Sequence, residues 1–186
     1  MALADLRRKL TYEDYVHFPD DGKRHEIMDG EHYVSPAPLL RHQRISMRLT
    51  VRLMPFIEQN GFGELFAAPA DVLLSLHDVL QPDLFYVSTQ RARIVTEQNV
   101  QGAPDLVIEI FSPSTRRVDE GIKLDRYDLL GVEEYWMLNP VLNTAKIYRR
   151  DGNRLVLVAE LSAVAGDVFT TPLLPGLEIP LAEIFA

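Results

Sequence analysis

The sequence predicts an α/β (α+β) fold: a mixed β-sheet flanked by helices, with added β-hairpins. A strand–helix–strand unit spans Gly102 to Pro140, and a long helix spans Leu39 to Asn60. The turns Asp29-Gly30 and Asp151-Gly152-Asn153 are typical of hairpins. A chain of 186 residues normally buries one core, so residues 1–186 are expected to form a single domain.

The composition is that of a soluble globular protein, with 47% hydrophobic and 25% charged residues. No apolar run is long enough to predict a membrane span, and the N-terminus lacks the apolar core of a signal peptide. The absence of cysteine excludes disulfides and thiol chemistry and favours a cytoplasmic location. The net charge of −8 argues against a broad electrostatic grip on nucleic acid, and leaves room for a local basic groove.

The central unit begins with a short apolar run, Leu106 to Phe111, bounded by Pro104 and Pro113. Its length, β-branched residues and flanking prolines predict a buried strand. Glu109 lies in the middle of this strand. A carboxylate in such a place must be paired, hydrogen-bonded or bound to a cation, because burying it alone is costly.

A helix is expected directly after this strand. Residues 112–115 form a good helix entry, with Thr115 or Ser114 as the N-cap, and Gly131 ends the helix after about four turns. A second apolar strand, Glu134 to Leu138, completes the strand–helix–strand unit.

Ahead of this unit, Thr11 is the expected N-cap of a short helix from Tyr12 to Phe18. Lys23 to Met28 and Glu31 to Val34 should form a hairpin across the Asp29-Gly30 turn.

The long helix has a face that should pack in the core: His42, Ile45, Leu49, Leu53, Phe56 and Ile57. Four arginines form an adjoining stripe: Arg41, Arg44, Arg48 and Arg52. This stripe is either a solvated face or a track for phosphates. Pro55 lies inside the helix and is expected to kink or split it.

Short strands should follow the long helix at Phe62–Ala68, Asp71–Leu76 and Pro82–Val87, with a turn at His77-Asp78 and a polar connection over Ser88–Gln101. Near the C-terminus, strands are expected at Ala145–Arg149, Leu155–Ala159 and Val168–Thr170. A last helical turn should run from Pro180 to Phe185, with Pro180 at its first position.

Asp83 and Glu109 are the first candidates for chemistry, because each lies in or at the start of an apolar strand. If the two strands are neighbours, the carboxylates meet at one end of the sheet and form a hard-oxygen site suited to magnesium. Alternatively, Asp83 caps a turn and Glu109 pairs with a buried cation.

Lys123 shares a helix face with Asp119 and Tyr127, four residues to either side. This face adjoins an apolar stripe, so Lys123 is expected at the core boundary and not in open solvent. By spacing alone, a surface Asp–Lys pair is the favoured interpretation; if Lys123 instead serves a site, Asp119 and Tyr127 are expected to hold it in place. Glu26 lies in the first hairpin and points either inward or to solvent. His42 is either a satisfied core residue or a ligand or base.

Several motifs together carry a family resemblance: residues 24–31 (RHEIMDGE), His42, Gln81-Pro82-Asp83, residues 102–115 (GAPDLVIEIFSPST), Asp119, Lys123, Tyr127 and residues 131–136 (GVEEYW). With these motifs, the sequence resembles the large bacterial family of putative restriction endonucleases within the PD-(D/E)XK nuclease superfamily. The resemblance covers about Thr11 to Phe185.

The resemblance implies a restriction-endonuclease-like core, with Asp83 as the acid of the Pro-Asp motif and Glu109 as the acid of the Glu-x-Lys motif. The lysine expected at position 111 is Phe111 in this chain. In such relatives the next helix is thought to supply the lysine, which selects Lys123. Asp105 is a rival metal ligand, and Asp83 is favoured over it.

The expected function is therefore that of a magnesium-dependent DNA endonuclease, with manganese as a substitute ion. Asp83, Glu109 and the Ile110 carbonyl would hold the ion. Lys123 would orient the attacking water or neutralise charge on the phosphate, and Glu26 and His42 would line the site. The alternatives are a nuclease fold kept as an inactive binding or assembly module, and a hydrolase of small phosphate esters. A homodimer is also expected, with exposed apolar residues near the C-terminal hairpin as its interface.

Overall fold

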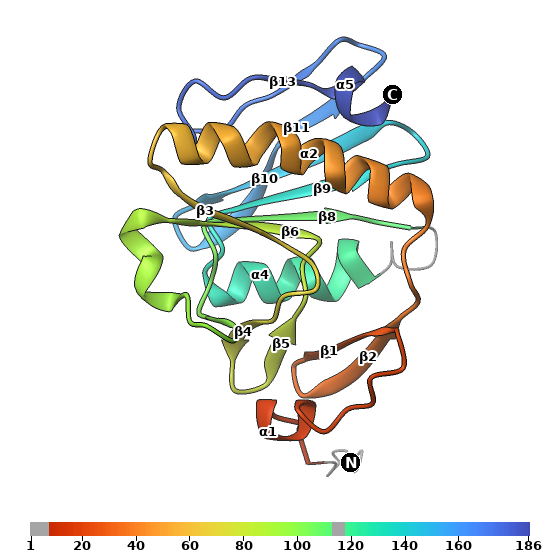
Figure 1. Cartoon of the computed structure of the whole chain (residues 1–186), viewed down its shortest axis with the longest axis vertical. Coiled ribbons are helices and arrows are strands. Elements are labelled where there is room, and N and C mark those ends of the chain that lie inside the picture. Colours follow the sequence, from red (N-terminus) through yellow and green to blue (C-terminus); the bar gives the residue numbers. More distant parts are fainter. Residues whose placement is uncertain (1–7, 113–117) are drawn as a thin grey trace.

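The structure is a computed structural model that describes residues 8–112 and 118–186 (Figure 1). Its largest sheet has six strands, which are, in spatial order, β11 (Arg154–Ser162), β10 (Thr144–Asp151), β9 (Glu134–Asn139), β8 (Leu106–Ile110), β6 (Leu84–Ser88) and β3 (Gly63–Ala67). The second sheet has five strands: β2 (Glu31–Ser35), β1 (Arg24–Met28), β5 (Asp78–Leu80), β4 (Val72–Ser75) and β7 (Val100–Gln101). The short strands β12 (Val168–Phe169) and β13 (Ile179–Pro180) pair with each other.

The described helices are α1 (Tyr12–Tyr15), α2 (Leu40–Gln59), α4 (Leu124–Leu130) and α5 (Leu181–Phe185), with a 3₁₀ helix η1 (Thr89–Ile94) and a π-helical turn η2 (Asp119–Lys123). This is the mixed α+β architecture that the sequence predicted. None of the helices in the described part of the chain is long and apolar enough to cross a membrane.

Helices cover both faces of the six-stranded sheet, with α2 on one face and α4 on the other (Figure 1). The central strands β8 and β9 run parallel, as expected for a strand–helix–strand unit. Successive side chains of a strand point to opposite faces. Ile108 and Ile110 therefore pack with the α2 cluster, and Val107 packs with Tyr127 of α4. By this alternation Glu109 points toward the α4 side.

Several predicted element ends are confirmed. The first hairpin turns at Asp29 and Gly30, which adopt positive φ values of 51° and 79°. Gly131 ends α4 in the left-handed conformation, with φ of 92°. The predicted caps Ser114 and Thr115 lie outside the described residues.

Other predictions are corrected. Helix α1 ends at Tyr15, short of Phe18, because Pro19 disfavours helical backbone in the residue before it. Pro55 does not split α2, which is continuous over Leu40–Gln59. Pro180 precedes α5 as its N-cap and is not its first residue.

The segment from residue 77 to residue 101 is more regular than predicted. Asp78 was expected in a turn but begins β5, where its carboxylate accepts two hydrogen bonds from Arg126. The connection Ser88–Gln101 contains η1 and β7, and β7 pairs with β4. Tertiary contacts fix both segments, so their own sequence pattern gave little signal.

The arginine stripe on α2 anchors the C-terminal helix. Arg41 Nη2 donates to the Phe185 carbonyl at 3.2 Å, and Arg48 Nη1 donates to the Ile184 carbonyl at 3.3 Å. Arg52 forms an exposed ion pair with the Glu183 carboxylate in α5. These contacts give three of the four arginines a structural role that neither sequence interpretation had considered.

Candidate active site

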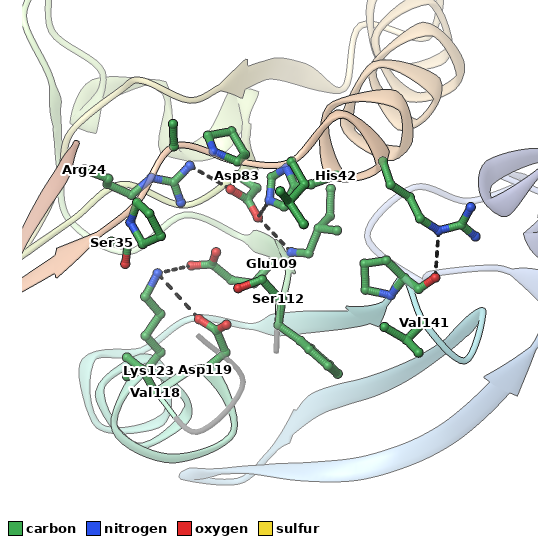
Figure 2. A pocket seen from close by; sticks show the side chains of 18 residues that line it. Arg24, Ser35, His42, Asp83, Glu109, Ser112, Val118, Asp119, Lys123 and Val141 are labelled. Atoms are coloured by element: carbon green, nitrogen blue, oxygen red, sulfur yellow. Dashed lines mark hydrogen bonds and ion pairs between the residues drawn. The ribbon is translucent and has the colours of Figure 1, made fainter. Parts of the chain in front are cut away.

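A cavity of about 440 Å³ lies where the end of β8, the start of α2 and the π-helical turn η2 meet (Figure 2). The predicted site residues on its wall are His42, Asp83, Glu109, Ile110 and Lys123. Glu26 is not on the described cavity wall and contacts the site through Lys123. Ser35 at the end of β2 and the connection to α2, residues 36–39, form another part of the wall.

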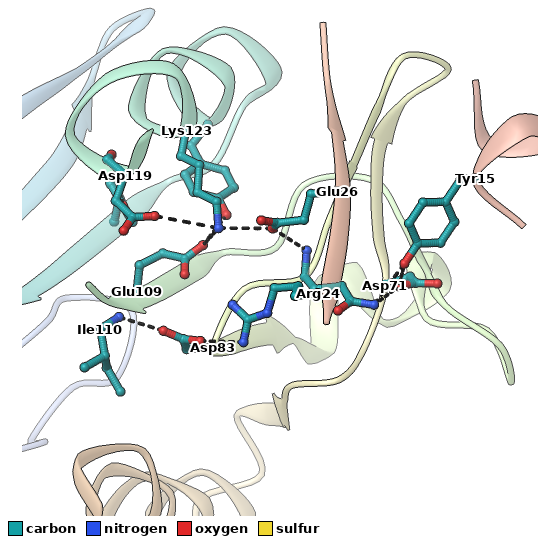
Figure 3. A network of polar contacts seen from close by, with 12 residues as sticks. Tyr15, Arg24, Glu26, Asp71, Asp83, Glu109, Ile110, Asp119 and Lys123 are labelled. Carbon is teal, nitrogen blue, oxygen red and sulfur yellow. Dashed lines mark hydrogen bonds and ion pairs between the residues drawn. The ribbon is translucent and has the colours of Figure 1, made fainter. Parts of the chain in front are cut away.

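Glu109 is held by one of its two carboxylate oxygens (Figure 3). Oε1 accepts hydrogen bonds from Lys123 Nζ at 2.9 Å and from the Tyr127 hydroxyl at 2.8 Å. Oε2 accepts no hydrogen bond from the described residues. Glu109 is thus paired with a buried cation and still has one oxygen left for a ligand at the cavity.

Lys123 is buried, with 3% of its surface exposed. Its Nζ lies 3.0 Å from Glu26 Oε1 and 3.7 Å from Asp119 Oδ1, in addition to its contact with Glu109. The exposed Asp–Lys pair favoured by spacing alone is therefore wrong, because this helical segment packs its Lys123 face against the sheet. A π-helical turn at this position is typical of functional sites.

Glu26 points inward and connects Lys123 to the N-terminal sheet (Figure 3). Its Oε1 accepts a hydrogen bond from the Gln81 backbone N–H at 2.9 Å. The Gln81 side chain in turn donates to Asp71 Oδ1 at 2.8 Å and to the Tyr15 hydroxyl at 2.9 Å. The Tyr15 hydroxyl donates to the same Asp71 oxygen at 2.7 Å.

Asp83 precedes β6, which pairs antiparallel with β8, so Asp83 lies beside the end of β8 that carries Ile110. Its Oδ1 accepts a hydrogen bond from Arg24 at 2.8 Å. Its Oδ2 accepts one from the Ile110 N–H at 2.8 Å and lies 2.8 Å from His42 Nε2. The two predicted acids therefore do meet at one end of the sheet, and Asp83 is not a turn cap.

His42 lies in the first turn of α2, on the helix face that carries the core residues. It is outside the apolar core itself. Its Nε2 contacts Asp83, and its buried Nδ1 has no hydrogen-bond partner among the described residues. Such an orphaned polar atom is costly unless a water or a ligand satisfies it.

One residue of this cluster, Arg24, was not assigned a role from the sequence. Arg24 lies two residues before Glu26 on β1, so strand alternation could have placed both side chains on one face. Asp119 was expected to hold Lys123 in place; its Oδ1 lies 3.7 Å from Lys123 Nζ, and it also lies on the cavity wall.

Asp105, the rival ligand, is absent from the described cavity wall. Its Oδ2 accepts a hydrogen bond from the Ser88 N–H at 2.7 Å, and Oδ1 lies 3.8 Å from Arg91 Nε. The preference for Asp83 over Asp105 therefore agrees with the geometry.

Among the described residues, the cluster contains more acids than permanent cations. The carboxylates are Glu26, Asp83, Glu109 and Asp119, and the permanent cations are Arg24 and Lys123. Burial raises the pKa of Glu109 to about 8; Lys123 opposes this, while the neighbouring acids add to it.

The other two central groups stay charged. Burial disfavours the Lys123 ammonium, but Glu109, Glu26 and Asp119 outweigh this effect and raise the pKa of Lys123 above its usual value. Burial likewise opposes ionisation of Asp83, but His42, Arg24 and the Ile110 N–H lower its pKa below the usual range. Lys123 is therefore suited to act as a cation and not as a base.

The donor chemistry fits a hard divalent cation. The free oxygen of Glu109 and the excess of buried acid would both favour such an ion. Among the described residues, no group of three or more His, Asp or Glu side chains is arranged to hold a metal. Magnesium is compatible with this, because it commonly takes one or two carboxylates and completes its shell with water and substrate phosphate.

The sheet with its parallel central pair and acids at one end is the restriction-endonuclease-like core. The chain belongs to the Uma2 family, described as putative restriction endonucleases, whose family model matches residues 12–182. The fold is similar to a crystal structure described as a putative nuclease belonging to DUF820 from Anabaena variabilis ATCC 29413. That comparison has a TM-score of 0.77 and 16% sequence identity, and it covers 95% of this chain and 97% of the other. No curated protein matches the sequence.

Proposed function

We propose that this protein is a magnesium-dependent endonuclease that hydrolyses phosphodiester bonds in DNA, with manganese as a substitute ion. The observation that carries the proposal is the buried cluster of four acids around Lys123 and Arg24, which opens onto a cavity. Membership of a family of putative restriction endonucleases supports the same reaction.

Asp83 and Glu109 would hold the ion, with the Ile110 carbonyl as a further ligand. When bound, the ion would polarise the phosphate and increase the acidity of a water molecule. Glu109 would use Oε2, because Lys123 and Tyr127 already occupy Oε1. Arg24 and the Ile110 N–H would keep the Asp83 carboxylate in a fixed orientation.

Lys123 would take the place of the lysine that the superfamily carries at position 111. Because its raised pKa keeps it protonated, it would stabilise negative charge that develops on the phosphate, and it would not abstract a proton. Glu26 and Asp119 would hold its ammonium in place while Glu109 is engaged elsewhere. His42 would support Asp83 and offer Nδ1 to a water at the wall.

The test is incubation of the pure protein with supercoiled, linear duplex and single-stranded DNA, with Mg²⁺, Mn²⁺ or EDTA. Cleavage is expected with either ion and not with EDTA. Asp83→Ala and Glu109→Gln should abolish it. Asp105→Asn is the matched control, since it changes a buried acid of the same sheet outside the described cavity wall, and it should keep activity.

The outcomes separate this proposal from its rivals. DNA binding without cleavage under every condition would favour the inactive binding module. Hydrolysis of a small phosphate diester together with intact DNA would favour the small-ester hydrolase. Cleavage that survives in both acid variants would point to a contaminating nuclease.

A further inference from the structure

Helix α2 is apolar on two opposite faces. Its inner face is buried in the core: Ile45, Leu49, Leu53 and Ile57. Its outer face carries an exposed outer stripe: Leu40 at 71%, Met47 at 63%, Val51 at 59% and Met54 at 37% exposure. At 100° per residue these residues fall on the side of the helix opposite the core face.

A helix that covers a sheet normally presents a polar outer face, and a helix with two apolar faces is typically covered on both. Exposed apolar surface that gathers along one element marks an interaction site more often than scattered single residues do. Figure 1 shows α2 running across the sheet, with α5 beside it. The outer stripe stays exposed in this arrangement. The outer stripe therefore predicts a protein partner.

The charges along this face indicate which partner fits. Arg44 and Glu58 are exposed and lie seven residues before and seven residues after Val51. Neither forms an ion pair with the described residues. If two copies of α2 pack antiparallel about a twofold axis at Val51, each Arg44 lies opposite Glu58 of the other copy. The symmetry makes this pair twice, as an isologous interface requires.

The shape of the surface agrees with the same pairing. A shallow hollow of about 390 Å³ lies on the N-terminal half of the outer face, lined by Leu40, Gln43, Arg44, Met47 and Arg48. In the antiparallel arrangement this hollow faces the C-terminal half of the second helix, where Met54 lies opposite Arg48. Methionine is flexible and fills irregular hollows well.

We propose that the outer face of α2 is the homodimer interface, with a second copy of this chain bound antiparallel about Val51. Val141 and Leu142, exposed by 71% and 62%, extend the apolar surface beside the first turn of α2. That loop is fixed to α2 because Arg41 Nε donates to the Pro140 carbonyl at 2.8 Å. The interface differs from the one expected at the C-terminal hairpin, where Val156, Leu157 and Val158 are 38–46% exposed.

This arrangement sets the distance between the two cavities. His42 lies nine residues before Val51 on the same helix. In an antiparallel pair, the two His42 positions are about 27 Å apart along the helix axes at 1.5 Å per residue.

The natural absence of cysteine allows a direct test by cross-linking. Val51→Cys places one thiol at the proposed axis, so oxidation or a short bis-maleimide should convert it to a covalent dimer. Leu157→Cys tests the hairpin interface, and Leu76→Cys, at a position 64% exposed between β4 and β5, reports random collision. Cross-linking of Leu157→Cys in preference to Val51→Cys would overturn the proposal.

Charge reversal tests the register, with the mass in solution measured by light scattering at tens of micromolar. Arg44→Glu and Glu58→Arg should each weaken the dimer at least about tenfold, since like charges then oppose each other. The double variant Arg44→Glu/Glu58→Arg should restore it. A monomeric wild type at about 100 μM, a dimer insensitive to both single changes, or a double variant that stays monomeric would each contradict the proposal.

Discussion

Two buried acid clusters in this protein differ in how well their charge is balanced. Asp78 is fully buried and matched to one arginine: Arg126 donates Nε to Oδ1 at 2.7 Å and Nη2 to Oδ2 at 2.6 Å. The Asp29 N–H and the Ser75 hydroxyl complete its partners. In the cavity cluster, by contrast, the four acids contact only two permanent cations among the residues that the structure describes.

The comparison shows that a buried acid is not by itself a sign of function. Asp78 fixes the position of a strand and a helix, and its charge is neutralised within the fold. Glu134 is a second such case, since Arg149, Thr171 and Trp136 satisfy its carboxylate. An excess of buried acid costs stability, so its presence beside a cavity supports the proposed cation site.

The largest effect on stability should come from breaking the balanced cluster. Asp78→Asn removes the buried charge partner of Arg126 and leaves it only the more exposed Asp29 carboxylate, at 3.6 Å, so it should cost about 3 kcal/mol of unfolding free energy, measured by urea denaturation at pH 7. Asp125→Asn, an exposed neighbour of Arg126, is the control and should change stability by less than about 0.5 kcal/mol.

This cost should depend on pH. Burial opposes ionisation of Asp78, but hydrogen bonds from Arg126, the Asp29 N–H and Ser75 outweigh it and lower its pKa from the usual 3.8. The stabilisation is therefore present above pH 3.8 and is lost as the pH falls below it. A gap between wild type and Asp78→Asn that stays constant down to pH 2.5 would count against this assignment.

The next largest effect should be on catalysis. With saturating metal, Lys123→Ala should lower kcat by about 10²–10³-fold, because it removes the cation that stabilises the transition state. Metal affinity, followed by titration with Mn²⁺, should be retained. Assays well below the melting temperature of the variant separate this loss from unfolding. Cleavage at the wild-type rate would exclude Lys123 as the migrated lysine.

A smaller effect on kcat should follow from removing one hydrogen bond in the chain of contacts that supports Glu26. Tyr15→Phe removes a hydroxyl that orients Asp71 and Gln81, which holds Glu26, and should lower kcat by about tenfold with KM unchanged. Tyr12→Phe is the matched control, since its hydroxyl on the same helix accepts a bond from Asn99.

Both substitutions should cost about 1 kcal/mol of stability, as expected for one lost hydrogen bond. Equal kcat values for Tyr15→Phe and Tyr12→Phe would show that the chain through Gln81 has a structural role only.

The smallest effect should be at an exposed pair. Arg52 and Glu183 form an ion pair in which the side chains are 55% and 43% exposed. Arg52→Ala should change the unfolding free energy by a few tenths of a kcal/mol, because solvent screens such pairs. A loss above about 1 kcal/mol would show that α5 depends on this pair more than its exposure suggests.

Local patterns in the sequence predicted most sheet strands except β5 and β7, the long helix and both acids, because periodicity and an acid in an apolar run are local signals. Glu109 could be identified in this way. The full burial of Lys123 could not be predicted from local patterns, because it depends on how η2 and α4 pack against the sheet. The partner of Asp78 was missed for the same reason, since Arg126 is 48 residues away in sequence.

The sign of a stability change distinguishes an unbalanced acid cluster from a balanced one. In metal-free protein at pH 9, where Glu109 is ionised, Glu109→Gln removes an excess buried charge and keeps an oxygen for Lys123 and Tyr127. Its melting temperature should rise above that of the wild type, by about 2–4 °C for each kcal/mol gained. Asp78→Asn should lower it under the same conditions. A fall in melting temperature for Glu109→Gln comparable to that for Asp78→Asn would show that both clusters are balanced. It would contradict an excess of buried acid at the cavity.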